Sequence, residues 1–156
     1  MDLLKERWHS TWAALGRSAP AGLFERLLLA WSEPQRHYHT LQHLEECLAL
    51  FDELRAEARH PCEIELALWF HDAVYDVRAH DNEARSAQWS VRELDAAGLD
   101  TESCRRIHDL IMATCHTASP ASASGALLVD IDLAILGADE PRFATYQRQI
   151  RAEYPW

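Results

Sequence analysis

Hydrophobic residues along this chain recur at the three- and four-residue spacing of amphipathic helices, and no stretch shows the period-two alternation typical of strands. Leu4, Trp8, Trp12 and Leu15 form one such hydrophobic face near the N-terminus. Helices are expected over these approximate ranges: 2–15, 20–33, 40–59, 61–76, 81–98, 100–116, 127–137 and 141–154. The sequence therefore predicts an all-α bundle of about seven to eight helices.

Residues that start and stop helices support these boundaries. Pro20 and Pro61 can occupy first helical turns, where the missing N–H of proline is not needed. Thr40 is a candidate N-cap, and Gly98 is a candidate terminator. Residues 117–125, with the sequence TASPASASG, are small and mostly polar, which is typical of a mobile loop.

Length and charge narrow the classes of function. A chain of 156 residues fits one domain with a hydrophobic core. The formal net charge of −10 argues against a nucleic-acid polymer or an anionic membrane as partner, because both are bound through Lys and Arg. The four cysteines form no CxxC pair, the N-terminus is charged, and no apolar run reaches 18 residues. A cytoplasmic protein with reduced thiols is expected.

The segment Leu66–Asp76, LALWFHDAVYD, places ionisable side chains inside an otherwise apolar predicted helix. Burying His71 and Asp72 in such a run is costly unless each is paired or bound to metal. An adjacent nitrogen and oxygen donor suits a divalent cation. These two residues are therefore the centre of a candidate metal site.

Two other predicted helices offer donors that could complete this site. His43 lies at the edge of the hydrophobic stripe of the third helix, and Asp132 lies on a face of the seventh that is expected to be buried. Two imidazoles and two carboxylates suit a divalent Mn, Fe, Co, Ni, Zn or Mg ion, and the set lacks the thiolates of a structural zinc site. His39, one turn before His43, and Asp130, beside Asp132, are competing donors.

Four stretches of the chain resemble one bacterial branch of the HD-domain superfamily of metal-dependent phosphohydrolases: RHYHTLQHLEE, ALWFHDAVYD, NEARSA and LLVDIDLAILG. The resemblance covers roughly residues 31–154. It implies an HD-domain helical bundle whose metal ligands are His43, His71, Asp72 and Asp132. Because the family commonly continues past an EYPW-like segment, residues 1–156 are expected to be a single HD domain without that C-terminal extension.

Asp76 is the candidate catalytic residue. It follows Asp72 by four residues in the same predicted helix and so lies on the same face one turn later, where its carboxylate could orient or deprotonate an attacking water. The HD hydrolases of guanosine tetraphosphate carry a Glu-Asp pair at this point. Here Tyr75 stands in place of the Glu, which weakens the case for the same substrate.

Several other side chains are candidates for contacting substrate. Arg36 and Arg78 could bind phosphate oxygens, since a guanidinium offers them two parallel hydrogen bonds. His39 could also contact substrate, and His116 could lie near the metal. Alternatively, His108 and His116 could hold a second metal, as extra histidines do in some HD proteins.

The leading hypothesis is a metal-dependent phosphohydrolase that acts on a small phosphorylated compound such as a nucleotide. One alternative is an HD-type di-iron oxygenase, which the extra histidines would permit. Another is a non-catalytic regulatory protein that binds metal or nucleotide. The presence of Tyr75 where the related hydrolases carry a Glu favours this alternative. The sequence leaves open a homo-oligomer, since its six tryptophans could serve an interface as well as a core.

Overall fold

The computed structural model describes residues 2–156, and over this range the protein is all-helical. The described residues form eight α-helices and two short 3-10 helices with these bounds: α1 (Asp2–Ala14), α2 (Leu23–Trp31), α3 (Leu41–Leu54), η1 (Arg55–Glu57), α4 (Pro61–Phe70), α5 (Asn82–Ala96), α6 (Thr101–Ala113), α7 (Ala123–Asp132), η2 (Leu133–Gly137) and α8 (Glu140–Glu153). The predicted all-α class and number of helices are confirmed.

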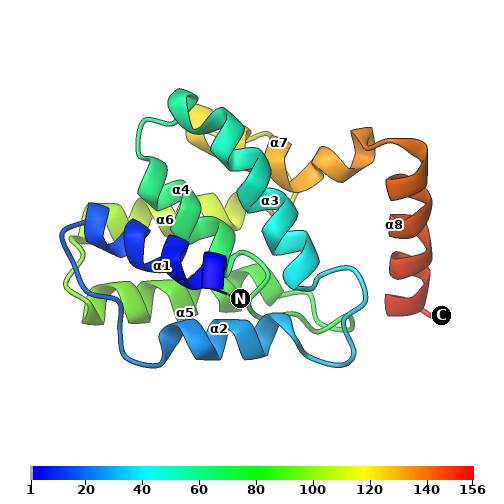
Figure 1. Ribbon diagram of the computed structural model, residues 1–156, viewed down its shortest axis with the longest axis horizontal. Coiled ribbons are helices and arrows are strands. Elements are labelled where there is room, and N and C mark those ends of the chain that lie inside the picture. The colour runs from blue at the N-terminus through cyan, green and yellow to red at the C-terminus, as the bar shows by residue number, and fades with distance from the viewer. Residues whose placement is uncertain (1) are drawn as a thin grey trace.

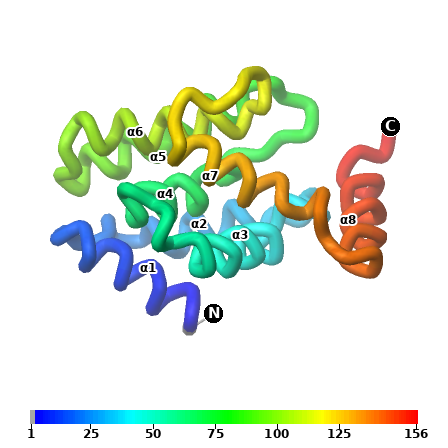
Figure 2. Tube along the Cα trace, turned by 90° about the horizontal axis from the view of Figure 1, so that it is seen from above, coloured from blue at the N-terminus to red at the C-terminus, as the bar shows by residue number. Residues whose placement is uncertain are grey.

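Helix α4 is the centre of the bundle (Figures 1 and 2). It packs against α1, α3, α5, α6 and α7, and every residue from Glu63 to Phe70 is buried. A helix that is covered on all sides is expected to be apolar all round, and α4 is so except for the buried Glu63 and Glu65. Neither α4 nor any other helix within residues 2–156 has the length and hydrophobicity to cross a bilayer.

Most of the tryptophans belong to the core. Trp8, Trp12, Trp31 and Trp69 are fully buried. The ring of Trp8 packs edge-to-face on Trp12 and Trp69, with centroid distances of 5.7 and 5.1 Å. Aromatic pairs in this arrangement add to the stabilisation from apolar burial. Core packing therefore accounts for most of the high tryptophan content.

Two helices begin at other residues than predicted. Helix α2 begins after Gly22, whose φ of 70° lies in the left-handed region, so Pro20 precedes the helix and does not start it. Helix α7 begins after Ser122, whose hydroxyl accepts the N–H of Gly125 at 3.0 Å. The predicted loop is therefore shorter and ends at this N-cap.

Helix α4 ends earlier than the sequence predicts, and this changes where His71 and Asp72 lie. The helix ends at Phe70, and the N–H of Ala73 closes a turn onto the carbonyl of Phe70 at 2.9 Å. His71 and Asp72 therefore lie in the turn that ends α4 and not in a helix interior. In the same way, α7 ends at Asp132 and continues as the 3-10 helix η2.

Helix α8 lies at one end of the molecule, beyond η2, and is drawn in red in Figures 1 and 2. Its first half is bound to α3, because Arg142 makes two parallel bonds of 2.7 and 2.8 Å to the carboxylate of Glu46. Tyr146 packs its ring against Tyr38, with centroids 4.7 Å apart. These contacts hold α8 against the start of α3.

The C-terminal end of α8 is fixed by one buried carboxylate, that of Glu153, which is 3% exposed. Its Oε2 accepts the backbone N–H groups of His37, Tyr38 and His39 at 2.7, 2.8 and 3.2 Å. Its Oε1 lies 2.5 Å from Nδ1 of His39. The segment before α3 therefore wraps around the end of the last helix.

We expect this carboxylate to make the fold sensitive to acid. Burial alone would raise the pKa of Glu153, but the bonds from His39 and the backbone lower it from 4.5 to about 2. Since the folded-state pKa is below the unfolded one, the stabilisation is complete above about pH 5 and is lost as the pH falls toward about 2. Glu153→Gln should therefore lower the free energy of unfolding by on the order of 3 kcal/mol at neutral pH and by much less near pH 2.5.

Urea unfolding of wild type and variant at both pH values measures this difference. The wild-type minus variant difference isolates Glu153 from the other carboxyl groups of the chain. A difference that stays constant with pH would contradict the assignment.

Candidate metal centre

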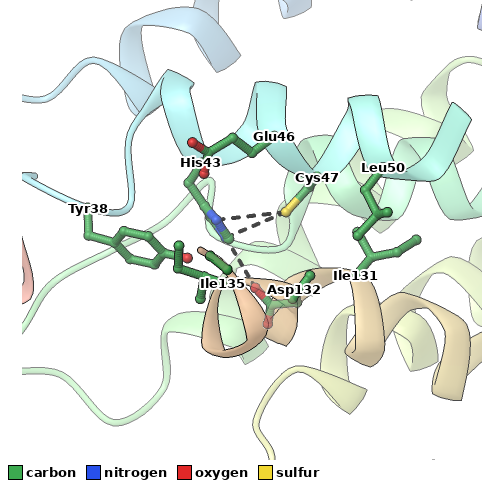
Figure 3. Close-up of a pocket in the computed structure, with 10 residues that line it drawn as sticks. Tyr38, His43, Glu46, Cys47, Leu50, Ile131, Asp132 and Ile135 are labelled. Carbon is green, nitrogen blue, oxygen red and sulfur yellow. Dashed lines mark hydrogen bonds and ion pairs between the residues drawn. The ribbon is translucent and has the colours of Figure 1, made fainter. Parts of the chain in front are cut away.

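Four side chains from three parts of the chain converge beside the end of α4. His43 projects from α3, His71 and Asp72 follow α4, and Asp132 is the last residue of α7. One ligand atom of each lies within 4.8 Å of all the others. Figure 3 shows His43 and Asp132 facing each other between α3 and the end of α7. The structure thus brings together the four predicted ligands, and this cluster could hold a metal ion.

The donor atoms are spaced as neighbouring ligands of one ion would be. His43 Nε2 lies 3.2 Å from His71 Nε2 and 3.1 Å from Asp132 Oδ1. His71 Nε2 lies 3.2 Å from Asp72 Oδ2 and 3.5 Å from Asp132 Oδ1. Ligands about 2.1 Å from an ion are roughly 3.0 to 3.4 Å apart in octahedral or tetrahedral sites. The mixed imidazole and carboxylate set therefore fits a divalent cation.

The direction of the His71 ring is fixed by its surroundings. Its Nδ1 lies 2.8 Å from the carbonyl oxygen of Leu68, so this nitrogen donates to the backbone and Nε2 is left as the ligand atom. The buried ring of Trp31 packs against it at 5.4 Å between centroids, and Trp31 Nε1 donates to the carbonyl of Trp69 at 3.0 Å. The imidazole is therefore held toward the other three donors.

Arg36, predicted to bind phosphate, instead binds the protein backbone. Its Nη1 donates to the carbonyl oxygens of Asp72 and His39 at 2.6 and 3.2 Å, and its Nη2 donates to that of Ala73 at 3.1 Å. Two of these carbonyls belong to the turn after α4, where helical partners are missing. The predicted role is corrected: the guanidinium is buried and engaged, and it holds the turn that carries His71 and Asp72.

The two carboxylates of the cluster are ionised at neutral pH. Burial would raise the pKa of Asp72, but the charge of His71 outweighs it and lowers this pKa to about 2. For Asp132 burial is again opposed, here by hydrogen bonds from His116, His43 and His71, which hold its pKa well below the ordinary value. Ionised carboxylates are the form that binds metal.

The competing donors lie outside the four-residue cluster. Asp130 is exposed on α7, whereas Asp132 faces the imidazoles. His39 has its Nδ1 engaged by Glu153, whereas the ring of His43 enters the cluster. The geometry thus places His43 and not His39, and Asp132 and not Asp130, in the cluster.

His116 lies next to the cluster. Its Nε2 is 3.0 Å from Oδ2 of Asp132, whose Oδ1 faces His43. The backbone φ of His116 is 53°, in the left-handed region that residues other than glycine rarely adopt. Such conformations concentrate at functional sites. Asp132 therefore connects His116 with the four-residue cluster.

Asp76, the predicted catalytic residue, is not brought to the cluster. Because α4 ends at Phe70, the helical spacing that placed Asp76 beside Asp72 does not apply. Asp76 is exposed, and its carboxylate accepts the N–H of Arg78 at 2.9 Å. The prediction that Asp76 lies one helical turn after Asp72 is therefore wrong, because α4 ends before both residues.

Arg78 and His108 also lie apart from the four donors. The guanidinium of Arg78 is over the ring of Trp156, 5.1 Å from its centroid. His108 has a partly exposed side chain on α6, and its Nδ1 contacts Asp109 at 3.2 Å. Of the two histidines considered for a second metal, only His116 is adjacent to the cluster.

Two pockets adjoin the cluster. One of about 170 Å³, shown in Figure 3, lies between α3 and η2, where Cys47 Sγ is 3.8 Å from both ring nitrogens of His43. The other, of about 320 Å³, is lined by Asp72 and Asp132 together with these residues: Tyr38, His39, Tyr75, Glu83, Thr114, His116, Leu133, Ile135, Leu136, Tyr146, Ile150 and Tyr154. The larger pocket is the candidate substrate site.

Sequence reasoning missed three polar residues of this region. Glu83 lines the larger pocket, and the stretch NEARSA within the resemblance is the signal that could have found it. Glu153 and Tyr154 belong to the EYPW segment at the chain's end. No local pattern indicated that Glu153 would bond to residues more than a hundred positions away.

No family model, curated protein or solved structure matches this chain. The site is therefore characterised by its own geometry. It is a two-histidine, two-aspartate cluster that could hold a metal ion, placed at the wall of a pocket in an all-helical protein.

We expect a divalent cation to raise the Tm of the wild-type protein and Asp132→Ala to remove this rise. At a hundredfold excess over Kd, binding to the folded state stabilises it by about 2.7 kcal/mol. Thermal unfolding with and without Mn²⁺ or Zn²⁺ measures the effect. Asp130→Ala, which removes an exposed carboxylate of the same helix, is the matched control and should keep the full rise. Equal rises in both variants would argue against Asp132 as a ligand.

Arg36→Lys should weaken metal binding although it removes no ligand. A single ammonium cannot hold the carbonyls of Asp72 and Ala73 as the guanidinium does. We expect Kd for Mn²⁺ to rise about 10- to 100-fold, the usual effect of residues that orient ligands. Calorimetric titration gives Kd, and Arg26→Lys, at an exposed ion pair, is the control. An unchanged Kd would show that the turn keeps its geometry without Arg36.

Proposed function

We propose that this protein is a metal-dependent phosphohydrolase of the HD-domain type that acts on a small phosphorylated compound. One observation carries the proposal: two histidines and two aspartates form a buried cluster that opens on a pocket of about 320 Å³. The order of these residues along the chain and the all-helical fold that carries them agree with the resemblance to HD-domain hydrolases. His43, His71, Asp72 and Asp132 would hold a divalent ion, which would supply the activation of water and the polarisation of a phosphoryl oxygen.

The lining of the pocket favours a substrate with few phosphates. Among the described residues that line it there is no Lys or Arg, and Glu83 adds a carboxylate to Asp72 and Asp132. His39 and His116 are the side chains there that can carry positive charge or donate to phosphate oxygens. A polyphosphate would meet too little compensating charge, so a monophosphate is the better fit.

The walls of the pocket favour an aromatic or apolar group beside the phosphate. Tyr38, Tyr75 and Tyr146 present rings, and Leu136 and Ile150 add aliphatic surface. Such surfaces bind planar groups by burial and stacking. These properties agree with a nucleoside monophosphate as substrate class.

One observation favours a second candidate, an oxygenase with two irons. His116 is bonded to the second carboxylate oxygen of Asp132, and these two side chains could help to hold a second metal ion. His108 does not join it. With a single additional histidine beside the cluster, hydrolysis at one metal centre is the function that we favour.

The test combines metal content with product release. The assay uses Mn²⁺ and a panel of nucleoside mono-, di- and triphosphates, and we expect wild type to release phosphate from the monophosphates. Asp72→Ala should lower kcat more than about 100-fold, which exceeds the usual effect of mutating a residue that only orients a metal ligand. Asp130→Ala should retain activity because its carboxylate is exposed and away from the cluster.

Other outcomes would contradict the proposal in distinct ways. Full hydrolysis by metal-free protein would exclude this mechanism. Two irons per chain with consumption of dioxygen would support the oxygenase. Tight nucleotide binding with no product would indicate a regulatory protein.

A further inference from the structure

His39 is held on three sides beside the pocket. Its Nδ1 lies 2.5 Å from Oε1 of Glu153. The ring of Tyr75 stacks on its face, with centroids 4.0 Å apart, and the ring of Tyr38 packs edge-on at 4.8 Å. A side chain fixed in this way cannot change rotamer without breaking all three contacts.

Glu153 is itself immobilised, so it can act as an orienting group. Its side chain has no exposed surface, and three backbone N–H groups hold the other carboxylate oxygen. Tyr154, the next residue, bonds its hydroxyl to that of Tyr75. The Tyr75 ring that stacks on His39 is thus tied to the same end of α8.

The carboxylate determines which imidazole nitrogen carries the proton. An ionised Glu153 accepts, so Nδ1 of His39 donates and a neutral ring has its lone pair on Nε2. Within residues 2–156, Nε2 of His39 makes no hydrogen bond, and its side chain is 17% exposed. His39 lines the larger pocket together with Asp72 and Asp132. A free acceptor is therefore available at the candidate substrate site.

We propose that His39 is the proton acceptor of the hydrolysis and that Glu153 is its positioning residue; this inference rests on the proposed function. The oxygen of the attacking water forms a bond to phosphorus as its proton moves to Nε2 of His39. The bond from phosphorus to the leaving oxygen breaks, and that oxygen keeps the electron pair and takes a proton from solvent. The imidazolium, stabilised by Glu153, then returns its proton to solvent.

The other titratable groups near the pocket are less suited to this role. Asp76 is exposed and outside the residues that line the pocket. His116 uses its Nε2 on Asp132. Glu83 lines the pocket, but its carboxylate interacts with the thiol of Cys115 and is not held by a buried carboxylate as His39 is.

The experiment compares four variants on the nucleoside monophosphate that wild type hydrolyses fastest with Mn²⁺. His39→Ala should lower kcat about 10²- to 10⁴-fold, the usual contribution of a general base, with a much smaller change in KM and with bound Mn²⁺ nearly unchanged. Added imidazole should restore part of the activity of His39→Ala and none of the activity of Asp132→Ala. Glu153→Gln should lower kcat by a smaller factor. Arg148→Ala, which removes an exposed side chain of the same helix that bonds to Thr145, is the control and should keep kcat near wild type.

A second measurement does not depend on turnover. In ¹H–¹⁵N spectra of the Zn²⁺-loaded protein, wild-type His39 should show a proton on Nδ1 with a strongly low-field shift, and Glu153→Gln should lose that signal. If wild type is active and His39→Ala keeps its kcat or loses its Mn²⁺, the role of His39 is overturned while the hydrolase remains. If wild type releases no phosphate from any compound, the proposed function fails and this inference falls with it.

Discussion

The structure depends on how charge is compensated in the buried helix α4. Toward its N-terminal end the chain supplies arginines: Arg106 makes two parallel bonds to Glu63, and Arg7 bonds to Glu65. At the other end, within the described residues, Asp72 has no Arg or Lys partner and faces imidazoles instead. Removing a carboxylate from water is costly unless it gains an equivalent partner. Here the imidazoles of His71 and His43 are the partners of Asp72, and they are groups that bind a metal ion when neutral. This difference between the arginine-paired start of α4 and the turn after its end is one physical reason to regard the cluster as a candidate metal centre.

The packing that buries α4 also positions the donors. Helices α3 and α7 both pack against α4. Each places one donor side chain, His43 or Asp132, beside the turn at the end of α4. Two residues near the end of α2 hold that turn. Trp31 packs against the His71 ring, and Arg36 donates hydrogen bonds to the backbone carbonyls of the turn. The site is therefore built on packed helices and supported by a second layer of contacts, which is the arrangement that keeps ligand geometry precise.

Helix α8 completes the pocket. It stands at the end of the molecule, and its inner face contributes Tyr146, Ile150 and Tyr154 to the lining. Its attachment relies on Glu153, which bonds to the backbone of the segment that carries His39. The same carboxylate thus closes the pocket wall and orients a histidine within it. The attachment of α8 and the orientation of His39 therefore depend on the same residue.

The sequence by itself determined the helical class, the number of helices and the His71-Asp72 pair as the centre of the candidate site, because periodic hydrophobicity and an ionisable pair in an apolar run are local properties that can be read from neighbouring residues. Only the tertiary structure decided where α4 ends, and with it that Asp76 does not follow Asp72 along one helix face and that Arg36 bonds to the backbone of the turn. It also decided between Asp132 and Asp130, and it revealed Glu153. These outcomes depend on contacts between segments far apart in the chain, whose distances and hydrogen bonds exist only after the helices have packed.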